Sequence, residues 1–422
     1  MLSKLIALLV IVLGVVAIAQ LVRVYELSSK LRKRGEHEIT DRDNNLNGRM
    51  MFMFVIALYA FFLWLVVRYG WTGRGEAAST IGRETDWLLN VNFVIIIAVF
   101  LLTNTLLFYF SYRYVRKEGV KAFYYPHNNK LEMLWTVVPA CVLAVIIILG
   151  LKKWNDATSA ASDDAIRVEL YSKQFDWTAR YSGYDNMLGR FDYKLTTDKN
   201  ELGLMTTATI DSAIFAMEHG VTGIDSLEAK LNNRKIMLVP EEREKMETDL
   251  SRKQRLIRLL YQMQAHHDKK MDRAAQDDII QKDTLYLCAN KEYEFNFRAK
   301  DVIHSAYFPH FRAQINTVPG MTTRFKFTPD ITTKEMRVKK NDAKFNYVLM
   351  CNKICGGAHY KMKMIVVVLS EKEYNKWMKG AQAKTFKTIF SPAPSAPAAP
   401  VAGADTLAVA VDTVAMPAPV KK

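Results

Sequence analysis

The stretch Cys351-Asn352-Lys353-Ile354-Cys355-Gly356-Gly357-Ala358-His359-Tyr360-Lys361-Met362 decides the fold of the polar part of this chain. It places two thiols four residues apart, an imidazole four residues further on and a thioether three residues beyond that. These are soft or borderline donors, the set that suits copper. The two glycines let a ligand loop turn tightly. The stretch therefore predicts a metal-binding loop between two strands, at 345–350 and 362–369.

The donors of this loop also bear on how many metal ions it holds. A Cys pair alone would fit a disulfide, half of a zinc site or core packing. His359 and Met362 make the pattern more specific, because zinc rarely takes methionine. A mononuclear blue-copper site needs one Cys, two His and a weak Met, so the second Cys is surplus for one copper and sufficient for two. With His304 as a further imidazole, we predict a two-copper electron-transfer centre bridged by Cys351 and Cys355.

The composition excludes several classes of protein. The chain has 422 residues, enough for two or three domains, and a formal net charge of +15. Much of the Lys and Arg flanks apolar segments, which indicates membrane orientation rather than nucleic-acid binding. Of the four cysteines, Cys141 and Cys288 lie in runs typical of buried side chains, so no disulfide framework is expected. Neither a C-x-x-C-H haem motif nor a phosphate-binding loop occurs.

Four apolar segments predict transmembrane helices. They cover about residues 5–22, 50–67, 93–110 and 134–151 and contain no charged residue, which meets the length of about 18 residues for a spanning helix. The first segment could instead be a signal peptide, because Ala17-Ile18-Ala19 resembles a cleavage site. Cleavage would place the metal loop on the wrong side of a positive third loop, so we favour four spans.

The charges of the loops predict the orientation of these helices, because positive residues stay on the cytoplasmic side. They gather in the first and third loops, as Arg23, Lys30, Arg32, Lys33, Arg34, Arg42 and Arg49, then Arg113, Arg116, Lys117, Lys121 and Lys130. In the second loop Arg68, Arg74 and Arg83 are offset by Glu76, Glu84 and Asp86. We expect a bacterial inner-membrane protein with its N-terminus and its metal-binding domain on the periplasmic side.

The fourth span carries two residues of interest. Glu132 lies at its cytoplasmic start, where a carboxylate is favoured by the positive end of the helix. A role in admitting protons is the less favoured interpretation from physics alone. Pro139 predicts a kink, which is tolerated where neighbouring helices or waters satisfy the freed carbonyl.

The polar part predicts a sandwich of β-strands. Short runs rich in β-branched and aromatic residues lie at about 166–171, 174–181, 284–298, 323–328, 345–350 and 362–369, followed by a helix at 371–378. The expected fold class is therefore membrane-anchored all-β: four N-terminal transmembrane helices followed by an antiparallel β-sandwich with a helical insert.

The insert and the tail differ from the sandwich in composition. Pro240 can occupy the first turn of a helix whose apolar stripe contains Met246, Leu250, Ile257, Leu260 and Met263. The stripe could pack on its own domain or dock a partner, and the sequence favours neither. His266 and His267 lack a sulfur or carboxylate at ligand spacing, so we expect both to be exposed. Residues 391–422, rich in Pro and Ala, are predicted to be disordered.

Three blocks of the sequence resemble subunit II of haem-copper cytochrome c oxidase. They are the beginning of the fourth span, the run Asp301-Val302-Ile303-His304-Ser305 and the loop 351–362, with Val318-Pro319-Gly320 also fitting. The resemblance covers about 92–188 and 278–378 and implies a cupredoxin-like sandwich with a binuclear copper A centre. It implies a domain order of 1–91 (extension with two extra helices), 92–155 (transmembrane hairpin), 156–190 with 278–380 (copper A domain), 191–277 (charged helical insert) and 391–422 (tail).

The resemblance also implies roles for single residues. Cys351 and Cys355 would bridge the two coppers, and His304 and His359 would each bind one of them. Two weaker ligands would be Met362, to one copper, and the backbone carbonyl of Lys353, to the other. Glu132 matches the family carboxylate at the start of the K proton pathway.

Two positions depart from the family pattern. Phe175 stands where the family usually has the Trp that receives electrons from cytochrome c, while Trp177 matches a second family Trp. We expect electrons to be accepted near these two aromatic residues by an altered route. Lys353 replaces a Glu that helps to hold magnesium against subunit I, and lysine cannot do so. Together with the extra helices and the insert, these changes predict a donor held in a supercomplex.

The resemblance implies an electron relay within a larger enzyme. Electrons would pass from cytochrome c, or from a haem c domain of a donor complex, to the haem of subunit I, where oxygen is reduced and protons are pumped. The expected partners are subunit I, subunit III, this donor and the lipid bilayer, and no nucleic acid. An alternative is a membrane-anchored copper-binding protein for assembly or storage. Subunit II of quinol oxidases shares the architecture but lacks the copper ligands.

Overall fold

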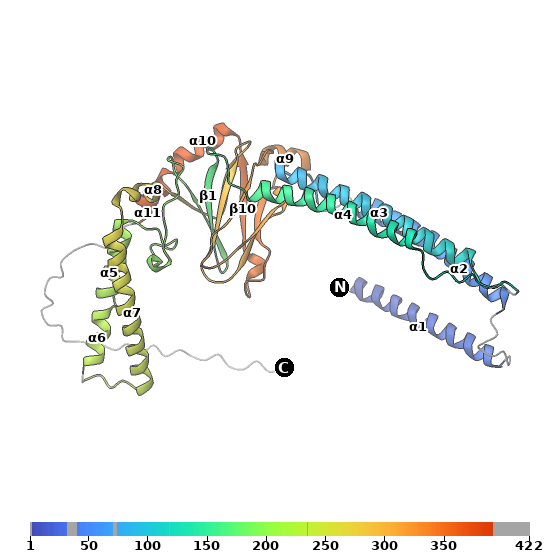
Figure 1. The fold of residues 1–422 in the computed structure, drawn as a ribbon. Helices are drawn as coiled ribbons and strands as arrows, with labels where there is room; N and C mark the ends of the chain where they lie inside the picture. The colour runs from blue at the N-terminus through green and yellow to red at the C-terminus, as the bar shows by residue number, and fades with distance from the viewer. Residues whose placement is uncertain (1, 32–39, 71–73, 118, 234, 391–422) are drawn as a thin grey trace. The chain divides into compact units, whose positions relative to one another are not determined.

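The computed structural model of the chain describes residues 2–31, 40–70, 74–117, 119–233 and 235–390 (Figure 1). The described residues form two compact units. One comprises the chain up to Arg180 together with Gln281–Lys379, and the other comprises Tyr181–Ile280 together with the described residues from Gly380 onward. The tail expected at 391–422 lies outside the described residues, and the domain boundaries expected at 91, 155, 190 and 277 stay predictions.

Four helices within the described residues are long and apolar enough to cross a membrane, which confirms the four predicted spans. They are α1 (Leu2–Leu31), α2 (Asp41–Tyr69), α3 (Thr80–Arg113) and α4 (Asn129–Thr158). The side chains of Thr40, Ser79 and Asn128 begin α2, α3 and α4, because each accepts a backbone N–H of the first turn. Helices α2, α3 and α4 lie side by side, and α4 runs continuously through Pro139.

The first unit contains the expected β-sandwich of two five-stranded sheets. One sheet has the strand order β3-β2-β1-β5-β8, formed by Ile279–Lys282, Asp176–Tyr181, Ile166–Lys173, Tyr293–Ala299 and Thr323–Phe327. The other has the order β4-β10-β9-β6-β7, formed by Thr284–Cys288, Lys363–Leu369, Tyr347–Cys351, His304–Phe308 and Ala313–Thr317. Helices α9 (Thr333–Lys340) and α10 (Glu371–Gly380) complete this unit.

The sandwich differs from the predicted one in two respects. Two strand pairs are parallel rather than antiparallel: β1 with β5 and β10 with β4. Parallel neighbours need a long crossover in the chain, and both pairs have one. The second unit lies between β1 and β5 in sequence, and strands β5 to β9 lie between β4 and β10. Strands β3, β6 and β7 were not predicted. In β6 side chains of both faces are buried, so the strand lacks the alternation that marks a half-buried strand.

Aromatic side chains fill the core between the sheets. The ring of Phe327 lies 4.9 Å from that of Phe295 and 5.1 Å from that of Phe311, and Tyr347 lies 4.9 Å from Phe311. Aromatic pairs at these distances add to the stabilisation that burial of their area provides. Phe308 of β6 joins the same cluster, 5.5 Å from Phe327, so the core packs β5, β6, β8 and β9 together, and β6 and β9 carry predicted metal ligands.

A segment before α3 completes one end of the sandwich. Residues Ala77, Ala78 and Ser79 are buried. The backbone N–H of Ala78 donates to His310 O (2.8 Å), and Ala78 O accepts the N–H of Asp330 (3.1 Å). The hydroxyl of Ser79 donates to Phe311 O (2.8 Å). The sandwich is thus joined to the start of α3 by hydrogen bonds from the backbone and a side chain.

Arg312 strengthens the same junction. Its guanidinium donates to both carboxylate oxygens of Asp86 in α3 (3.0 and 3.1 Å) and to the carbonyls of Arg74 (3.0 Å) and Gly75 (2.9 Å). Charge-assisted, forked hydrogen bonds of this kind are among the strongest in proteins. Arg312 therefore fixes the sandwich to the start of α3.

The second unit contains the helices of the insert. They are α5 (Thr207–His219), α6 (Ile224–Asn232), α7 (Pro240–His266) and α8 (Asp272–Gln276), followed after the sandwich by α11 (Phe386–Ile389). Helix α7 begins at Pro240, as predicted. Its residues Ile257 and Leu260 are buried against Ile210 and Ile214 of α5, and Met263 packs beside them. This part of the predicted stripe therefore packs within its own unit.

Candidate metal centre

Strand pairing brings the predicted ligands together. His304 is the first residue of β6 and Cys351 the last of β9, and these neighbouring strands pair Ala306 with Cys351. The N–H of Asn352 donates to Ser305 O (3.0 Å), and the N–H of Cys351 donates to Met362 O (3.0 Å). The ligand loop therefore begins and ends on adjacent strands, β9 and β10, beside the strand that carries His304.

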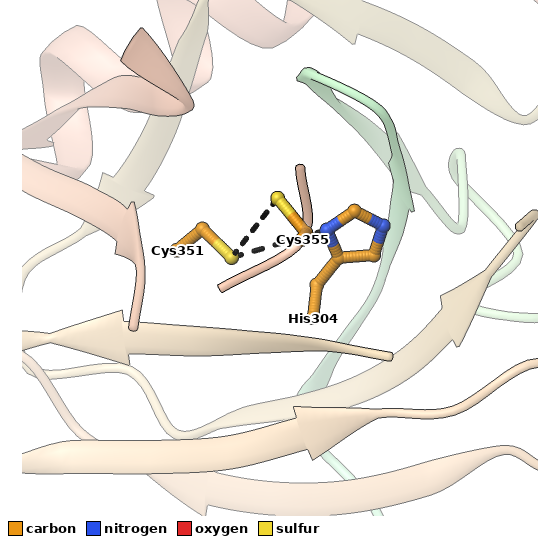
Figure 2. A group of neighbouring side chains, drawn as sticks. All are labelled: His304, Cys351 and Cys355. Carbon is orange, nitrogen blue, oxygen red and sulfur yellow. Dashed lines mark hydrogen bonds between the residues drawn. The ribbon is translucent and has the colours of Figure 1, made fainter. Parts of the chain in front are cut away.

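Three ligand atoms form the centre of the site (Figure 2). The Sγ atom of Cys351 lies 3.9 Å from Cys355 Sγ and 3.9 Å from His304 Nδ1. The ligating atoms of the three residues all lie within 4.8 Å of one another, and the three residues are buried. One thiol thus contacts both the other thiol and an imidazole.

The remaining predicted donors surround this group. Cys355 Sγ lies 3.5 Å from His359 Nδ1 and 3.8 Å from Met362 Sδ. The backbone carbonyl of Lys353 lies 3.1 Å from Cys351 Sγ, while the lysine side chain is exposed. The other four predicted donors therefore lie around the two thiol sulfurs, with His304 and the Lys353 carbonyl beside Cys351 and with His359 and Met362 beside Cys355.

Asp301 orients one of the imidazoles. Its Oδ1 lies 2.9 Å from His304 Nε2, which leaves Nδ1 directed at Cys351. Burial opposes ionisation of Asp301, but hydrogen bonds from the N–H of Gln174, from His304 and from the N–H of Val302 outweigh burial and lower the pKa of the carboxyl. The ionised carboxylate fixes the ring orientation, as outer-shell carboxylates do for metal-bound histidines.

Burial changes the acidity of one of the two thiols. Burial, with the neighbouring Cys351 as a second cause, raises the pKa of the Cys355 thiol to about 11. A metal cation binding here would displace that proton, because the thiolate is the metal-binding form. The donor set of two thiols, two imidazoles, one thioether and one carbonyl fits soft or borderline copper better than zinc or a hard cation.

Gly356 permits the close approach of two loops. Its φ is +141°, and a Cβ atom there would lie 2.8 Å from Gln174 Nε2 and 2.9 Å from the ring of Phe175. The side-chain amide of Gln174 donates to Cys355 O, which ties the ligand loop to the turn between β1 and β2. Gly357 has no atom within 4 Å of such a Cβ, so of the two glycines only Gly356 is required by its surroundings.

The two aromatic residues predicted to accept electrons differ in exposure. Trp177 is 1% exposed, and its ring lies 6.3 Å from that of His304. Phe175 is half-buried and lies against the ligand loop at Gly356. Trp177 therefore neighbours a ligand from inside the sandwich, whereas Phe175 lies closer to the surface.

The remaining predicted residues lie elsewhere in the chain. Glu132 lies in the first turn of α4, where its carboxylate accepts the N–H of Asn128 (3.2 Å), so it caps the helix. The expectation that His267 is exposed was wrong: its side chain is 6% exposed, and Nε2 lies 2.6 Å from Asp272. The Asp272 carboxylate, five residues further on, is thus the partner of the His267 imidazole, for which the sequence had predicted none. His266 is exposed, as expected.

Two supporting residues were not identified from the sequence. Asp301 precedes His304 by three residues, a spacing that places a carboxylate beside an imidazole at the start of a strand. The sequence around Gln174 gives no indication of its role, because its amide contacts a loop that is distant in sequence.

The fold and the soft-ligand cluster define a class: proteins with helices long and apolar enough to cross a membrane, followed by a β-sandwich with a loop at one end that could hold a metal ion. Residues 69–152 match the family "Cytochrome C oxidase subunit II, transmembrane domain". The alternative cytochrome c oxidase subunit 2 of Bradyrhizobium diazoefficiens is 26% identical over 80% of this chain and 92% of its own length. Cytochrome c oxidase subunit 2 of Cereibacter sphaeroides is 24% identical over 78% of this chain and 86% of its own.

The chain is thus similar in sequence to these two cytochrome c oxidase subunits 2 along most of its length, and residues 69–152 carry the match to the family's transmembrane domain. Among solved structures, the periplasmic domain of subunit II of cytochrome oxidase from Bradyrhizobium japonicum aligns with 54% of this chain and 98% of its own. The alignment has 15% identity and a TM-score of 0.26, a likeness that adds nothing to the assignment.

Proposed function

We propose that this chain is the electron-relay subunit of a respiratory cytochrome c oxidase. It accepts electrons from a cytochrome c type donor at a binuclear copper A centre and passes them to the haem of subunit I. Oxygen reduction there is coupled to proton pumping. The observation that carries the proposal is the convergence of two imidazoles, a thioether and a carbonyl around the neighbouring thiols of Cys351 and Cys355.

Two bound copper ions would supply one-electron acceptance and release with the charge shared between them. The chain's own residues hold the ligands in place. Asp301 orients His304, and the Gln174 amide fixes the loop at Cys355. Burial of His304, Cys355 and Met362 excludes water from the inner side of the centre. Ligands that cannot move keep the geometry constant between oxidation states, which favours rapid electron transfer.

The orientation and partners follow from the same proposal. The sandwich lies on the periplasmic side of a bacterial inner membrane, as the positive first and third loops indicate. Subunits I and III lie beside the transmembrane helices, and the donor is cytochrome c or a haem c domain held in a supercomplex. Glu132 admits protons at the cytoplasmic side. Because Lys353 presents a cationic side chain, we propose that this subunit supplies no magnesium ligand at that position.

The burial of the thiols argues against a copper-assembly or storage protein. Such a protein needs thiols that solvent and a partner can reach, whereas Cys351 is 9% and Cys355 5% exposed. A complete ligand set between two strands is instead typical of a resident metal.

Copper content and the visible and near-infrared spectrum of the full-length chain test the proposal. We expect about two coppers per chain and a purple mixed-valence spectrum. Cys351→Ser should abolish that spectrum and reduce copper binding by more than the roughly 10–100-fold that outer-shell changes cost, because a bridging ligand is lost. One copper or one zinc per chain, or an unchanged spectrum in Cys351→Ser, would overturn the assignment.

A further inference from the structure

The two halves of helix α7 differ in how far their apolar residues are covered. Its buried residues, Ile257 and Leu260, both lie in the second half, where α5 packs against them. In the first half, Met246 and Leu250 of the predicted stripe are only half-buried. Helix α6 lies beside this half and contributes one buried residue, Leu227 (Figure 1). The first half of α7 therefore keeps apolar surface that α6 alone does not cover.

An open groove lies between α6 and this half of α7. Its volume is about 960 Å³, and its lining extends from Glu241 to Arg252, with Leu227 and Met246 as apolar residues. A helical stretch of that length covers about 18 Å. Most other lining residues are Glu, Lys or Arg, whose methylene stems add apolar surface. This groove, which we name the α6–α7 groove, therefore has room and apolar surface for a further short helix.

Negative charge gathers at the end of the groove where α7 begins. Glu241, Glu242 and Glu244 line this end and are exposed. They form no ion pair among the residues that the structure describes. Lys245 is the one lysine in the lining, so the glutamates outnumber it. This end of the groove therefore attracts a cationic group.

The C-terminal tail, which lies outside the described residues, contains a segment of matching length and pattern. All six of its prolines lie at 392–400 and 417–419, so residues 401–416 contain none. Leu407, Val411 and Val414 follow the i, i+4, i+7 spacing of one helical face. Asp405 suits the start of a helix, and Pro417 would end it. A helix over 406–416 would be about 16 Å long, close to the length of the groove.

The tail starts on the same unit as the groove, at the opposite end of α7. Helix α11, which precedes the tail, packs against α8, and the N–H of Phe386 donates to Asp278 O (2.8 Å). Helix α8 follows the C-terminal end of α7 after one short turn. From that end to Arg252 the helix covers about 21 Å. The Pro- and Ala-rich residues 391–404 span about 40 Å when extended, so the tail reaches the groove.

We propose that the tail segment 405–416 docks as a helix in the α6–α7 groove, with its apolar face against Leu227 and Met246. A tail that arrives from the C-terminal end of α7 brings Lys421 and Lys422 to the end lined by the glutamates. Val and Thr are weak helix formers, so the segment becomes helical only where the groove covers its apolar face. The tail thus covers the part of α7 that α5 leaves open.

Hydrogen–deuterium exchange of the purified membrane protein tests this docking. The full chain is compared with a chain that ends at Gly403. Backbone N–H groups of residues 406–416 should exchange at least about tenfold more slowly than those of a free peptide of the same sequence. Residues 241–252 should exchange faster in the shortened chain. Equal exchange of residues 241–252 in the two chains would overturn the proposal, because the tail would then not cover the groove.

A labelled synthetic peptide of residues 404–422 provides a second test that leaves the fold of the chain undisturbed. It should bind saturably to the chain that ends at Gly403. Binding to the full chain should be at least about tenfold weaker, because the attached tail competes at a high effective concentration. No binding to the shortened chain, or equal binding to both chains, would overturn the proposal. Neither readout depends on copper or on electron transfer.

Variants of the peptide test which face docks. Val411→Asp should weaken binding by about tenfold or more, because a charge would enter the apolar part of the groove. The matched control is Val409→Asp, which makes the same change on the opposite face of the helix and should leave binding as in the unmodified peptide. Equal losses in the two peptides would overturn docking as a helix in this orientation.

A charge exchange tests the direction of the tail. Glu241→Lys with Glu242→Lys in the shortened chain should weaken binding of the peptide by about threefold, as expected for exposed ion pairs. A peptide with Lys421→Glu and Lys422→Glu should regain the lost affinity for this variant, since the pairs are then restored with reversed charge. A loss of binding that the exchanged peptide does not restore would overturn the assigned direction.

Discussion

The charged side chains near the two ends of strand β6 differ in whether they form ion pairs. The segments that adjoin its start, where His304 lies, carry four exposed lysines without an ion-pair partner in the described part of the chain: Lys300, Lys353, Lys361 and Lys363. Beyond its end, Arg312 pairs with Asp86. Near Arg312, Arg83 pairs with Asp330, and Lys339 pairs with Glu76 (2.8 Å). One strand therefore connects a surface with unpaired cations to a junction with paired ones.

This difference shows which end is an internal junction and which is available to a partner. Paired charges joined by hydrogen bonds hold two parts of one chain in a fixed arrangement. Unpaired exposed cations contribute little to stability but attract an opposite charge from outside. We therefore expect substitutions at the Arg312 end to change stability, and substitutions of the four unpaired lysines to change association rates.

Arg312→Ala should have the largest effect on stability. Asp86 would remain mostly buried with only the more distant Arg74 (3.7 Å) as a cation, and the carbonyls of Arg74 and Gly75 would lose a donor. Breaking a buried pair in this way costs about 4 kcal/mol. The free energy of unfolding of the full-length chain in detergent, from denaturant titration, measures the loss.

Arg312→Lys provides the matched control for this junction. The ammonium keeps the charge but cannot form the fork of hydrogen bonds, so we expect an intermediate loss. Equal stability of wild type and Arg312→Ala would contradict the idea that this end is a fixed junction.

Glu169 extends the comparison to the interior of the first sheet, where charge is also paired. Its carboxylate receives hydrogen bonds from Arg180 (2.6 Å) and Arg298 (2.6 Å). Burial opposes its ionisation, but the two guanidinium groups outweigh burial and lower the pKa of Glu169 from 4.5 to about 2. The stabilisation is complete above about pH 4.5 and is lost as the pH falls through 2, since the carboxylate then takes a proton.

The lowering of the Glu169 pKa from 4.5 to about 2 corresponds to about 3 kcal/mol of folding free energy. The free energy of unfolding should therefore decrease by up to about 3 kcal/mol between pH 5 and pH 2, measured by denaturant titration at each pH. Glu169→Gln should remove this part of the pH dependence. If the free energy of unfolding of Glu169→Gln falls between pH 5 and pH 2 as much as that of wild type, other carboxylates govern acid unfolding.

Gly356→Ala should have the smallest effect of these substitutions on stability, about 1–2 kcal/mol from the strained φ and the contact with Gln174 and Phe175. Its effect on the metal centre should be clearer, because the ligand loop must shift. We expect weaker copper retention during dialysis against a chelator and an altered visible spectrum.

Gly357→Ala is the control for that substitution. It makes the same chemical change one residue further on, where a Cβ meets no atom within 4 Å. Its stability and copper retention should equal those of wild type. Identical behaviour of the two variants would show that the loop does not depend on the close approach at Gly356.

Some of this architecture could be predicted from the sequence because its signals are local. The four spans follow from uninterrupted apolar runs, and α7 begins at the residue that Pro240 marks. The donors of the ligand loop lie within twelve consecutive residues, so their spacing alone indicated a metal site.

The rest depends on contacts between distant segments. His304 was counted as a donor for its residue type and through the resemblance to a family, because the pairing of β6 with β9 that brings it to the loop leaves no mark in either strand. Strand β6 was missed since both of its faces are buried, and the parallel pairing of β1 with β5 depends on the crossover rather than on local pattern. The partner of His267 was likewise invisible, because an Asp five residues away can point in any direction.

The insertion of Ala77–Ser79 against the sandwich affects how the protein can be divided. A soluble fragment excised after α4 would keep every predicted copper ligand but lose the residues that cover Phe311 and bond to His310 and Asp330. The fragment would then expose the unpaired backbone groups of His310, Phe311 and Asp330, together with aromatic surface, to neighbouring molecules. Aggregation of such a truncated product would then reflect the missing cover rather than a defect in the metal centre.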